Sequence, residues 1–316
     1  MITTTDRIFI TGHRGLVGRA LCDELIARGH SSKNIITATH DELDLTTPTD
    51  VADFFVQWRP TVVFHAAAKV GGILANDTQS GDFISANLAM QQNVIMNAHW
   101  HGVKKLLFFG SACAYPKFAK VPVPESALLT GELEPTNRSY AIAKIAGIEL
   151  CAALRKQYGR QFYSCMPTNL YGVGDHYHPQ TSHVIPGMIS RVHLAKRTAA
   201  LSAVLWGTGT PTREFLFAED LATAAIARLN VDGGPDLVNI SSGEEIPLRE
   251  VARLITQTIG YGGGVLWDTA KPYGTPRRAL DCTAFKQLCP DWRPRIELSH
   301  GLSLAYKDYL WQTGQE

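Results

Sequence analysis

Four side chains near the middle of the sequence could act together on a carbonyl group: Ser111, Cys113, Tyr140 and Lys144. The tyrosine and the lysine are four residues apart, so they share one face of a helix. A nearby ammonium group favours the phenolate and lowers its pKa from about 10, which lets a tyrosine exchange a proton with a substrate oxygen. Ser111 ends an apolar run and could hydrogen-bond the same oxygen. The set predicts a site that reduces carbonyls, and Cys113 adds a titratable group that reduction alone does not need.

These residues also have simpler interpretations. A tyrosine and a lysine at this spacing occur by chance in many helices, and a free cysteine is most often a small buried hydrophobic residue. The order of features along the chain favours the reducing site. A glycine-rich turn comes first, a strand that ends in Ser111 follows, and the helix with Tyr140 and Lys144 comes third.

The glycine-rich turn follows a short apolar strand at residues 7–11 and precedes a patterned helix at 19–28, which Gly29 is placed to terminate. It reads Gly12-His13-Arg14-Gly15-Leu16-Val17-Gly18. Glycines at such positions permit a tight turn, close approach of the backbone to a pyrophosphate and close packing of the helix. The helix N-terminus then faces the phosphates. In this context the spacing predicts a dinucleotide site rather than a merely structural turn.

The second strand bears on which dinucleotide is bound. An NAD site usually has Asp or Glu at the end of that strand to hold the ribose 2′-hydroxyl. Here the expected strand at 34–39 ends at His40, and Arg14 in the turn could pair with a 2′-phosphate. We therefore favour NADPH/NADP+, although both residues could also be solvated surface groups. Asp44 and Leu45 are weaker candidates for the adenine pocket.

Composition argues against several classes of protein. The 316 residues carry 30 basic and 29 acidic side chains, a formal net charge of +1, which argues against a broad nucleic-acid surface. No stretch approaches the roughly 20 apolar residues of a membrane span, and the polar N-terminus does not read as a signal peptide. The six cysteines form no C-x-x-C pair, and His176 and His178 have no thiol nearby. We expect reduced thiols, a cytoplasmic protein and no metal site.

Strands and helices alternate through the first half of the chain. Further strands are expected at 61–65, 103–109, 163–168 and 237–240, and helices near 48–58, 79–101, 139–158, 184–199 and 247–259. This alternation predicts an α/β fold, a Rossmann-type doubly wound parallel sheet with a smaller α/β C-terminal substrate domain. We assign 1–170 and about 216–243 to the cofactor domain, and 171–215 and 244–316 to the substrate domain. Residues 171–186 should form a loop over the cleft, and 205–215 reads as turn-rich.

Several motifs together resemble the extended short-chain dehydrogenase/reductase family of nucleotide-sugar enzymes, over nearly the whole chain. The specific motifs are Ser-x-Cys at 111–113, Ser-His-Val-Ile-Pro at 182–186 and Trp-Gly-x-Gly-Thr-Pro at 206–211. Within the family, the chain is similar to bifunctional enzymes that epimerise GDP-4-keto-6-deoxy-D-mannose at C3 and C5 and reduce its C4 ketone with NADPH to GDP-L-fucose. The resemblance implies a homodimer formed through helices of the first domain. The apolar face with Ile145 and Ile148 could serve that interface or simply face the core.

The resemblance also implies residue roles. Ser111, Tyr140 and Lys144 would perform the reduction, and Cys113 and His183 would be the epimerase base and acid. The substrate would contact Val70, Gly71, Ser111, Ala112, Cys113, Asn169, Arg191, Trp206, Arg213 and Lys271. The cofactor would contact Gly12, His13, Arg14, Gly15, Leu16, Val17, Gly18, His40, Asp44, Leu45, Ala67, Ala68, Gly110, Ser111, Tyr140, Lys144, Pro167, Thr168, Asn169, Leu170 and His183.

The chain departs from this family at two positions. The family often has Arg where His40 stands, so recognition of a 2′-phosphate rests more on Arg14. A Lys-Pro-Asp-Gly loop reads Lys-Pro-Tyr-Gly here, which puts a substrate contact in doubt at Tyr273. Two rival functions remain. Cys113 and His183 argue against a GDP-sugar 4-reductase without epimerase activity, and the intact reducing set argues against a non-catalytic dinucleotide sensor.

Overall fold

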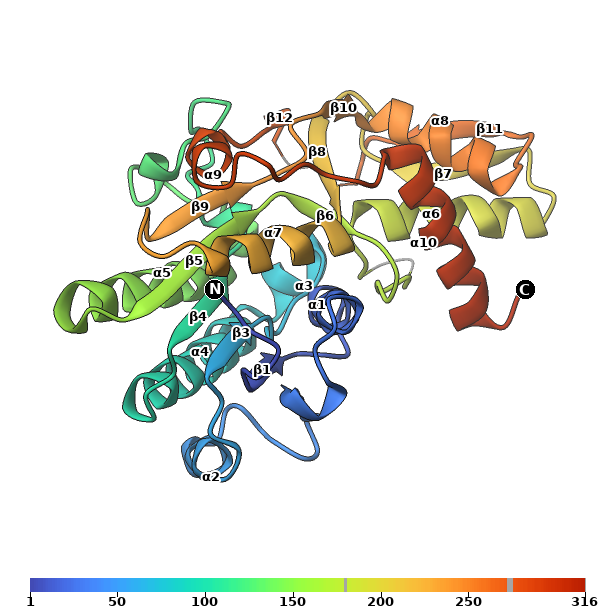
Figure 1. Ribbon diagram of the computed structural model, residues 1–316. Helices are drawn as coiled ribbons and strands as arrows, with labels where there is room; N and C mark the ends of the chain where they lie inside the picture. The colour runs from blue at the N-terminus through green and yellow to red at the C-terminus, as the bar shows by residue number, and fades with distance from the viewer. Residues whose placement is uncertain (179–180, 272–274, 316) are drawn as a thin grey trace.

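The computed structural model describes residues 1–178, 181–271 and 275–315. Within these ranges, the first five strands of the chain and β9 form a six-stranded parallel sheet with the order β2-β1-β3-β4-β5-β9 (Figure 1). In that order the strands are Ile35–Ile36, Ile8–Thr11, Val62–His65, Lys105–Phe109, Gln161–Pro167 and Leu237–Ile240. The predicted Rossmann-type parallel sheet is confirmed, and the last of these strands returns to it from far along the chain as expected.

Helices cover both faces of this sheet because strand side chains alternate between the faces. On β1, Ile8 and Ile10 belong to one buried cluster and Phe9 to the other. The first cluster lies under α1 (Leu16–Ala27) and α7 (Ala218–Asn230), and the second under α2 (Pro48–Trp58), α4 (Ser80–Trp100) and α5 (Arg138–Tyr158).

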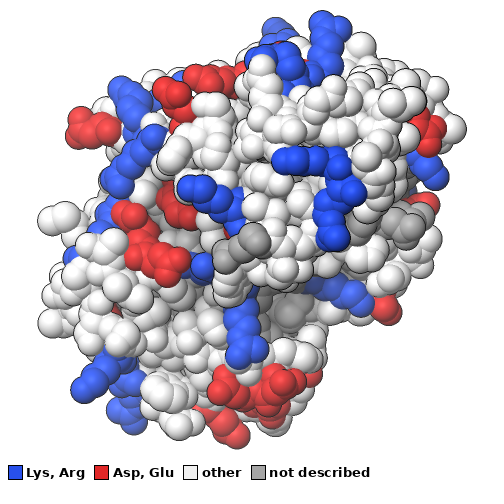
Figure 2. All heavy atoms as spheres, turned by 90° about the vertical axis from the view of Figure 1, so that its right-hand side faces the viewer, with Lys and Arg blue, Asp and Glu red and all other residues white. Residues whose placement is uncertain are grey.

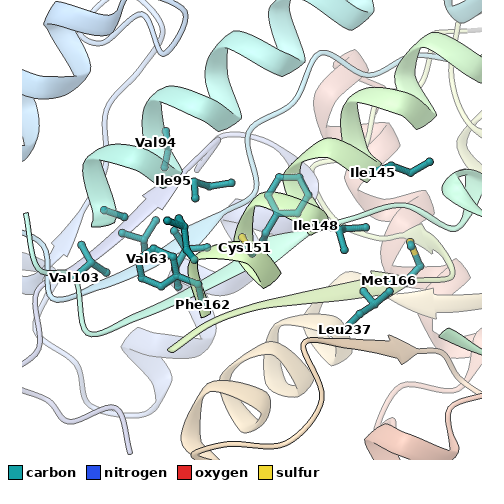
Figure 3. Close-up of a cluster of buried hydrophobic side chains, with 14 of the residues drawn as sticks. Val63, Val94, Ile95, Val103, Ile145, Ile148, Cys151, Phe162, Met166 and Leu237 are labelled. Atoms are coloured by element: carbon teal, nitrogen blue, oxygen red, sulfur yellow. The ribbon is translucent and has the colours of Figure 1, made fainter. Parts of the chain in front are cut away.

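The second cluster is drawn in Figure 3, where strand residues such as Val63 and Phe162 meet side chains of α4 and α5. Ile145 and Ile148 of α5 are only 8% and 3% exposed. The sequence left open whether this apolar face of α5 forms a dimer interface or packs in the core. In the structure it packs in the core.

The parallel sheet gathers loop residues at one edge. All the pairings between its strands are parallel, so the carboxyl ends of the strands lie on the same side. β1 lies between β2 and β3, so the winding changes direction there, and ligands of such sheets bind in the crevice at that point. Gly12, Ala66, Gly110 and Thr168 directly follow β1, β3, β4 and β5 at this edge.

The remaining elements build a third buried cluster beside the sheet, on the right of Figure 1. β8 (Thr212–Phe217) pairs with β6 (Asn169–Tyr171), β10 (Glu245–Pro247) and β12 (Arg277–Arg278), and β7 (Ser202–Trp206) pairs with β11 (Gly264–Asp268). The third cluster draws on α6 (Val184–Arg197), α8 (Leu248–Ile259) and α10 (Leu298–Thr313). Two short helices are α3 (Ile73–Thr78), before α4, and α9 (Thr283–Leu288), which packs against β9. The division into two domains at the residues given above stays a prediction.

Three predicted segments differ in the structure. The second strand covers only Ile35–Ile36, because it is an edge strand and the chain turns at Thr39, whose N–H donates to Glu42 at 2.8 Å. Helix α1 begins at Leu16 instead of residue 19, with the last glycine of the turn already inside it. The segment 205–215 is the end of β7, a turn and most of β8. Its two glycines and its proline obscured the two strands.

The face at the right of Figure 1 has no single sign of charge. Lys and Arg side chains are interspersed there with groups of Asp and Glu (Figure 2). No helix within the described ranges has the length and apolarity needed to cross a membrane.

The close packing of α5 on β4 yields a stability prediction. A Cβ at Gly147 would lie 2.4 Å from Cζ of the fully buried Phe108 ring. We expect Gly147→Ala to lower the free energy of unfolding by about 1–3 kcal/mol, because the ring or the helix must move. The matched control is Gly81→Ala in α4, where a Cβ meets nothing within 4 Å, and which should raise stability by about 0.4–1 kcal/mol. Urea unfolding measures both, and equal stabilities would contradict the packing argument.

Candidate active site

The glycine-rich turn between β1 and α1 has the close backbone contacts that a pyrophosphate site needs. Gly12 has φ +69°, and a Cβ there would lie 2.9 Å from backbone atoms of Ala67. A Cβ at Gly18 would lie 2.2 Å from the carbonyl oxygen of Gly12. Gly15 is exposed and immediately precedes the helix. The turn thus leaves the N-terminus of a 12-residue helix open to an anion.

Two side chains fix the distance between this turn and the loop after β3. The Thr11 hydroxyl hydrogen-bonds Nδ1 of His65 at 2.9 Å and accepts from the N–H of Ala67 at 3.0 Å. Burial, with a smaller effect of Lys144, lowers the pKa of His65 to about 3, so its ring is neutral. The predicted cofactor residues Ala67 and Ala68 are therefore held beside Gly12 by a neutral, buried pair.

The groups predicted to select NADPH lie at the surface. Arg14 and His40 are exposed. The Asp44 carboxylate accepts from the N–H and hydroxyl of Thr46 at 2.8 and 2.7 Å, which lowers its pKa, and lies 4.0 Å from His40. Glu42, which the sequence analysis did not consider, lies near enough to Arg14 for that arginine to help lower its pKa, after hydrogen bonds from Thr39.

Ser111 and Cys113 meet at the end of β4. A one-turn 3₁₀ helix, Ala112–Ala114, follows Ser111 and folds the chain back, so the Ser111 hydroxyl and the Cys113 Sγ are 3.0 Å apart. Burial raises the pKa of the Cys113 thiol, while the hydrogen bond with Ser111 and the charges of Arg278 and Lys144 oppose that rise. The thiol is thus buried next to the serine, with two cations near enough to favour its ionisation.

The pKa of Tyr140 is raised and not lowered in this structure, which corrects the sequence prediction. Its Nζ donates to the backbone oxygen of Phe109 at 2.8 Å and lies 5.8 Å from the centre of the Tyr140 ring. Burial disfavours both charged forms. It lowers the pKa of Lys144 to about 8 and raises that of Tyr140, a rise that Cys113 adds to and a hydrogen bond with Ser111 partly offsets. Tyr140 is therefore a neutral phenol, the form that can donate a proton.

His183 lies directly before α6 and is exposed. The loop that carries it contacts the loop after β3, because the N–H of Gly72 donates to the oxygen of Thr181 at 3.0 Å. Desolvation by the neighbouring segments, with a smaller effect of the nearby His176, lowers the pKa of His183. In the protein without ligands, His183 is therefore a neutral imidazole and Cys113 is a thiol, whereas the predicted roles of acid and base require imidazolium and thiolate.

A second group of predicted residues comes together away from the sheet edge. The Arg191 guanidinium lies 4.2 Å from the centre of the half-buried Trp206 ring, and Lys271 Nζ lies 5.9 Å from it. An aromatic face flanked by two cations suits a nucleotide base and its phosphates. Lys271 is the last residue before the loop with Tyr273, which lies outside the described residues.

Arg213 has a neighbour that the sequence analysis missed. It is register partner to Arg278 on the parallel strand β12, so the two side chains share one face of the sheet. Burial, with the charge of Arg278, lowers the pKa of Arg213 to about 10. The positive charge of Arg278 also works against the rise in the pKa of Cys113. Strand register joined these residues, and no local pattern in the sequence shows it.

The last predicted cofactor residues, Pro167 to Leu170, span the end of β5 and the start of β6. The side chains of Thr168 and Asn169 donate to the backbone oxygen of Glu214 at 3.2 and 2.9 Å. This connects the carboxyl edge of the sheet to the strand with Arg213. No cluster of three or more metal-ligating side chains occurs within the described ranges.

Comparison with known proteins shows the family to which the chain belongs. Residues 8–241 match the sequence model of the NAD dependent epimerase/dehydratase family. The chain belongs to this family.

Its relatives in the family cover the whole length. The chain is 52% identical over 304 residues to GDP-L-fucose synthase 1 of Arabidopsis thaliana, spanning 96% of this chain and 93% of the relative. It is 47% identical over 313 residues to the GDP-L-fucose synthase of Escherichia coli K12, spanning 96% of each. These matches place it among the GDP-L-fucose synthases, as the motifs predicted. The fold is also similar to a GDP-mannoheptose C4 reductase from Campylobacter jejuni with NADP bound, at 34% identity and a TM-score of 0.87, covering 98% of this chain and 99% of that one.

The buried Lys144 yields a prediction on pH. Its folded pKa of about 8 lies below the value of about 10.4 in an unfolded chain, so the folded state binds fewer protons between these pH values. Stability should therefore rise with pH across that window, by up to about 3 kcal/mol from this group. We expect the stability difference between Lys144→Met and the wild type to be largest below pH 8 and to shrink towards pH 10. A difference that urea unfolding finds independent of pH would contradict a buried ammonium.

Proposed function

We propose that this chain epimerises GDP-4-keto-6-deoxy-D-mannose at C3 and C5 and reduces the C4 ketone with NADPH to give GDP-L-fucose. The observation that carries the proposal is the 3.0 Å contact of Ser111 with Cys113, beside Tyr140. It puts a group able to take a proton from carbon next to a group able to protonate the C4 oxygen. The 47–52% identity to GDP-L-fucose synthases supports the same substrate.

The cofactor proposal rests on the fit of the glycine-rich turn. The space beside Gly12 and Ala67 would be filled by a single Cβ, and Gly15 leaves the helix N-terminus open. Arg14 is the exposed cation placed to meet a 2′-phosphate, and a relative at 34% identity was solved with NADP bound. NADPH bound here supplies hydride to the C4 carbon.

Epimerisation would use groups on both sides of the sugar. The C4 ketone acidifies the hydrogens on C3 and C5, so a Cys113 thiolate could remove one and His183 could return a proton to the opposite face. Ser111 and Tyr140 would donate hydrogen bonds to the enolate oxygen. The bound diphosphate, being anionic, would favour imidazolium at His183, and Arg278 and Lys144 favour the thiolate. Substrate binding would thereby create the charges that the free protein lacks.

Reduction would use the same oxygen-binding groups. Tyr140, a neutral phenol, protonates the C4 alkoxide. Lys144, held at the Phe109 oxygen, stands one helical turn away to stabilise the resulting phenolate. One oxygen pocket would then serve both reactions.

The nucleotide end of the substrate would lie on the second group of residues. Arg213 and Arg278, side by side on neighbouring strands, suit a diphosphate. Trp206 with Arg191 and Lys271 would contact the rest of the GDP.

A GDP-sugar 4-reductase without epimerase activity is the second candidate. It is favoured by the likeness to the Campylobacter jejuni C4 reductase and by the thiol and neutral imidazole of the ligand-free protein. Product stereochemistry separates the two candidates.

We also propose a homodimer that works in the cytoplasm. The six cysteines are free, which is typical of a reducing compartment. The adjoining helices α4 and α5 expose Trp100 and Tyr158, which are 66% and 53% exposed and could form part of an interface. Light scattering that finds a monomer would reject the dimer.

Product analysis tests the proposed function. The protein is mixed with GDP-4-keto-6-deoxy-D-mannose and NADPH in D2O, and the product is examined by NMR. We expect GDP-L-fucose with deuterium at C3 and C5, because the bases exchange with solvent. An undeuterated sugar of D configuration would support the 4-reductase instead, and no consumption of NADPH would reject both.

The role of Cys113 has its own test. Cys113→Ser should lose deuterium incorporation at C3 and C5 by about 100-fold or more, since a hydroxyl is a far weaker base than a thiolate. NADPH binding should be unchanged. Cys22→Ser, at a half-buried thiol of α1, is the matched control and should exchange like the wild type. Undiminished exchange in Cys113→Ser would remove Cys113 from the mechanism.

A further inference from the structure

Glu214 is a buried acid that the proposed chemistry does not use. It follows Arg213 on β8 and is 2% exposed. Its Oε1 accepts from the Ser241 hydroxyl at 3.0 Å and its Oε2 accepts from the N–H of Leu280 at 2.8 Å. Both carboxylate oxygens thus accept hydrogen bonds from segments that lie far away in the sequence, one after β9 and one after β12.

The segment after β12 matters because it carries Arg278. Leu280 is two residues beyond Arg278, so the bond to Glu214 fixes where β12 ends relative to β8. The backbone oxygen of Glu214 also accepts a hydrogen bond from the side chain of Asn169 at 2.9 Å. One residue therefore connects the strand of Arg213 with the segments that hold Arg278 and Asn169.

Alternation along β8 shows that Glu214 does not pair with the arginines directly. Arg213 and Arg278 share one face of the sheet, so the side chain of Glu214 points to the other face. Its carboxylate meets Ser241 and Leu280 there. Two neighbouring guanidiniums repel each other, and burial raises the cost of that repulsion.

A second anchor fixes the other side of the same segment. The fully buried Asn239 donates from Nδ2 to the oxygens of Val123 and Asp281, both at 2.9 Å, and accepts from the Tyr115 hydroxyl at 2.6 Å. Tyr115 is two residues after Cys113. The segment that follows Arg278 is therefore tied both to β8 and to the turn that carries Cys113.

From these contacts we propose that Glu214 is a positioning residue that holds Arg213 and Arg278 side by side as a rigid pair for the diphosphate of a GDP-sugar. Identifying the anion as a sugar nucleotide rests on the proposed function. Glu214 touches no substrate atom in this arrangement. Its loss should weaken the binding of GDP and of the GDP-sugar and leave NADPH binding unchanged, because the glycine-rich turn lies on other elements.

The test compares Glu214→Ala, Glu214→Gln and Ser241→Ala in the full chain. GDP binding is measured by calorimetry, and KM is measured separately for the GDP-sugar and for NADPH. For Glu214→Ala we expect the GDP Kd and the GDP-sugar KM to rise about tenfold or more, with NADPH KM within about twofold of wild type. Glu214→Gln should recover most of the loss, because its amide can accept from Leu280 and donate to Ser241. Ser241→Ala removes one of the two hydrogen bonds to the Glu214 carboxylate and should raise the GDP Kd by a smaller factor. If Glu214→Ala does not fold, Ser241→Ala still tests the positioning role.

The matched control is Glu245→Gln on β10. Glu245 lies in the same sheet and forms an ion pair at 2.6 Å with Arg277, the residue before Arg278. Glu245→Gln removes one negative charge, as Glu214→Gln does. It should bind GDP as the wild type does. Wild-type GDP affinity in both Glu214→Ala and Ser241→Ala, or an equal rise of GDP-sugar and NADPH KM, would overturn the positioning role. A wild type that binds GDP but turns over no sugar would reject the proposed function alone, and a wild type that does not bind GDP would reject both.

Discussion

The close contact between α5 and β4 is the constraint on which the active site depends. Gly147 has no side chain, so the helix lies directly on the Phe108 ring, and the Lys144 ammonium reaches the oxygen of Phe109 at 2.8 Å. This close packing of α5 on β4 places Tyr140 beside the loop that begins at Ser111. A helix held one side chain farther out would separate the proton donor from the serine and the thiol.

The same contact explains the charge states of Tyr140 and Lys144. A site that must protonate an oxygen has to exclude water, and exclusion of water penalises the phenolate and the ammonium alike. Lys144 retains its proton near neutral pH because a carbonyl oxygen and the face of the Phe108 ring solvate it, the latter at 4.8 Å. Tyr140 is neutral because burial raises its pKa. The expected activation of the tyrosine by the lysine is therefore not a property of the ligand-free protein.

Local features were predictable from the sequence and long-range ones were not. The glycine-rich turn, the Tyr140–Lys144 spacing and the parallel sheet follow from short patterns that determine one turn, one helix face or one strand. The neighbours Arg213 and Arg278 are joined only by the register of two strands far apart in the chain, and Glu214 bonds to segments that no pattern links to it. The pKa values of His65 and Tyr140 depend on burial, which a motif does not report. Strands β7 and β8 were obscured because glycine and proline in the turn between them dominate that segment.

The arrangement as a whole implies a division of work. In the proposed function, residues at the carboxyl edge of the sheet would act on the sugar ring, and the arginine pair and Trp206 would hold the nucleotide. Hydrogen bonds from Thr168 and Asn169 to Glu214 connect the two groups. The most direct measurement is a crystal structure with NADP+ and GDP-L-fucose bound. The account predicts the sugar O4 within about 2.6–3.2 Å of both the Ser111 and the Tyr140 hydroxyls, with the diphosphate between Arg213 and Arg278. An O4 out of reach of Ser111 and Tyr140, or a diphosphate bound away from both arginines, would contradict it.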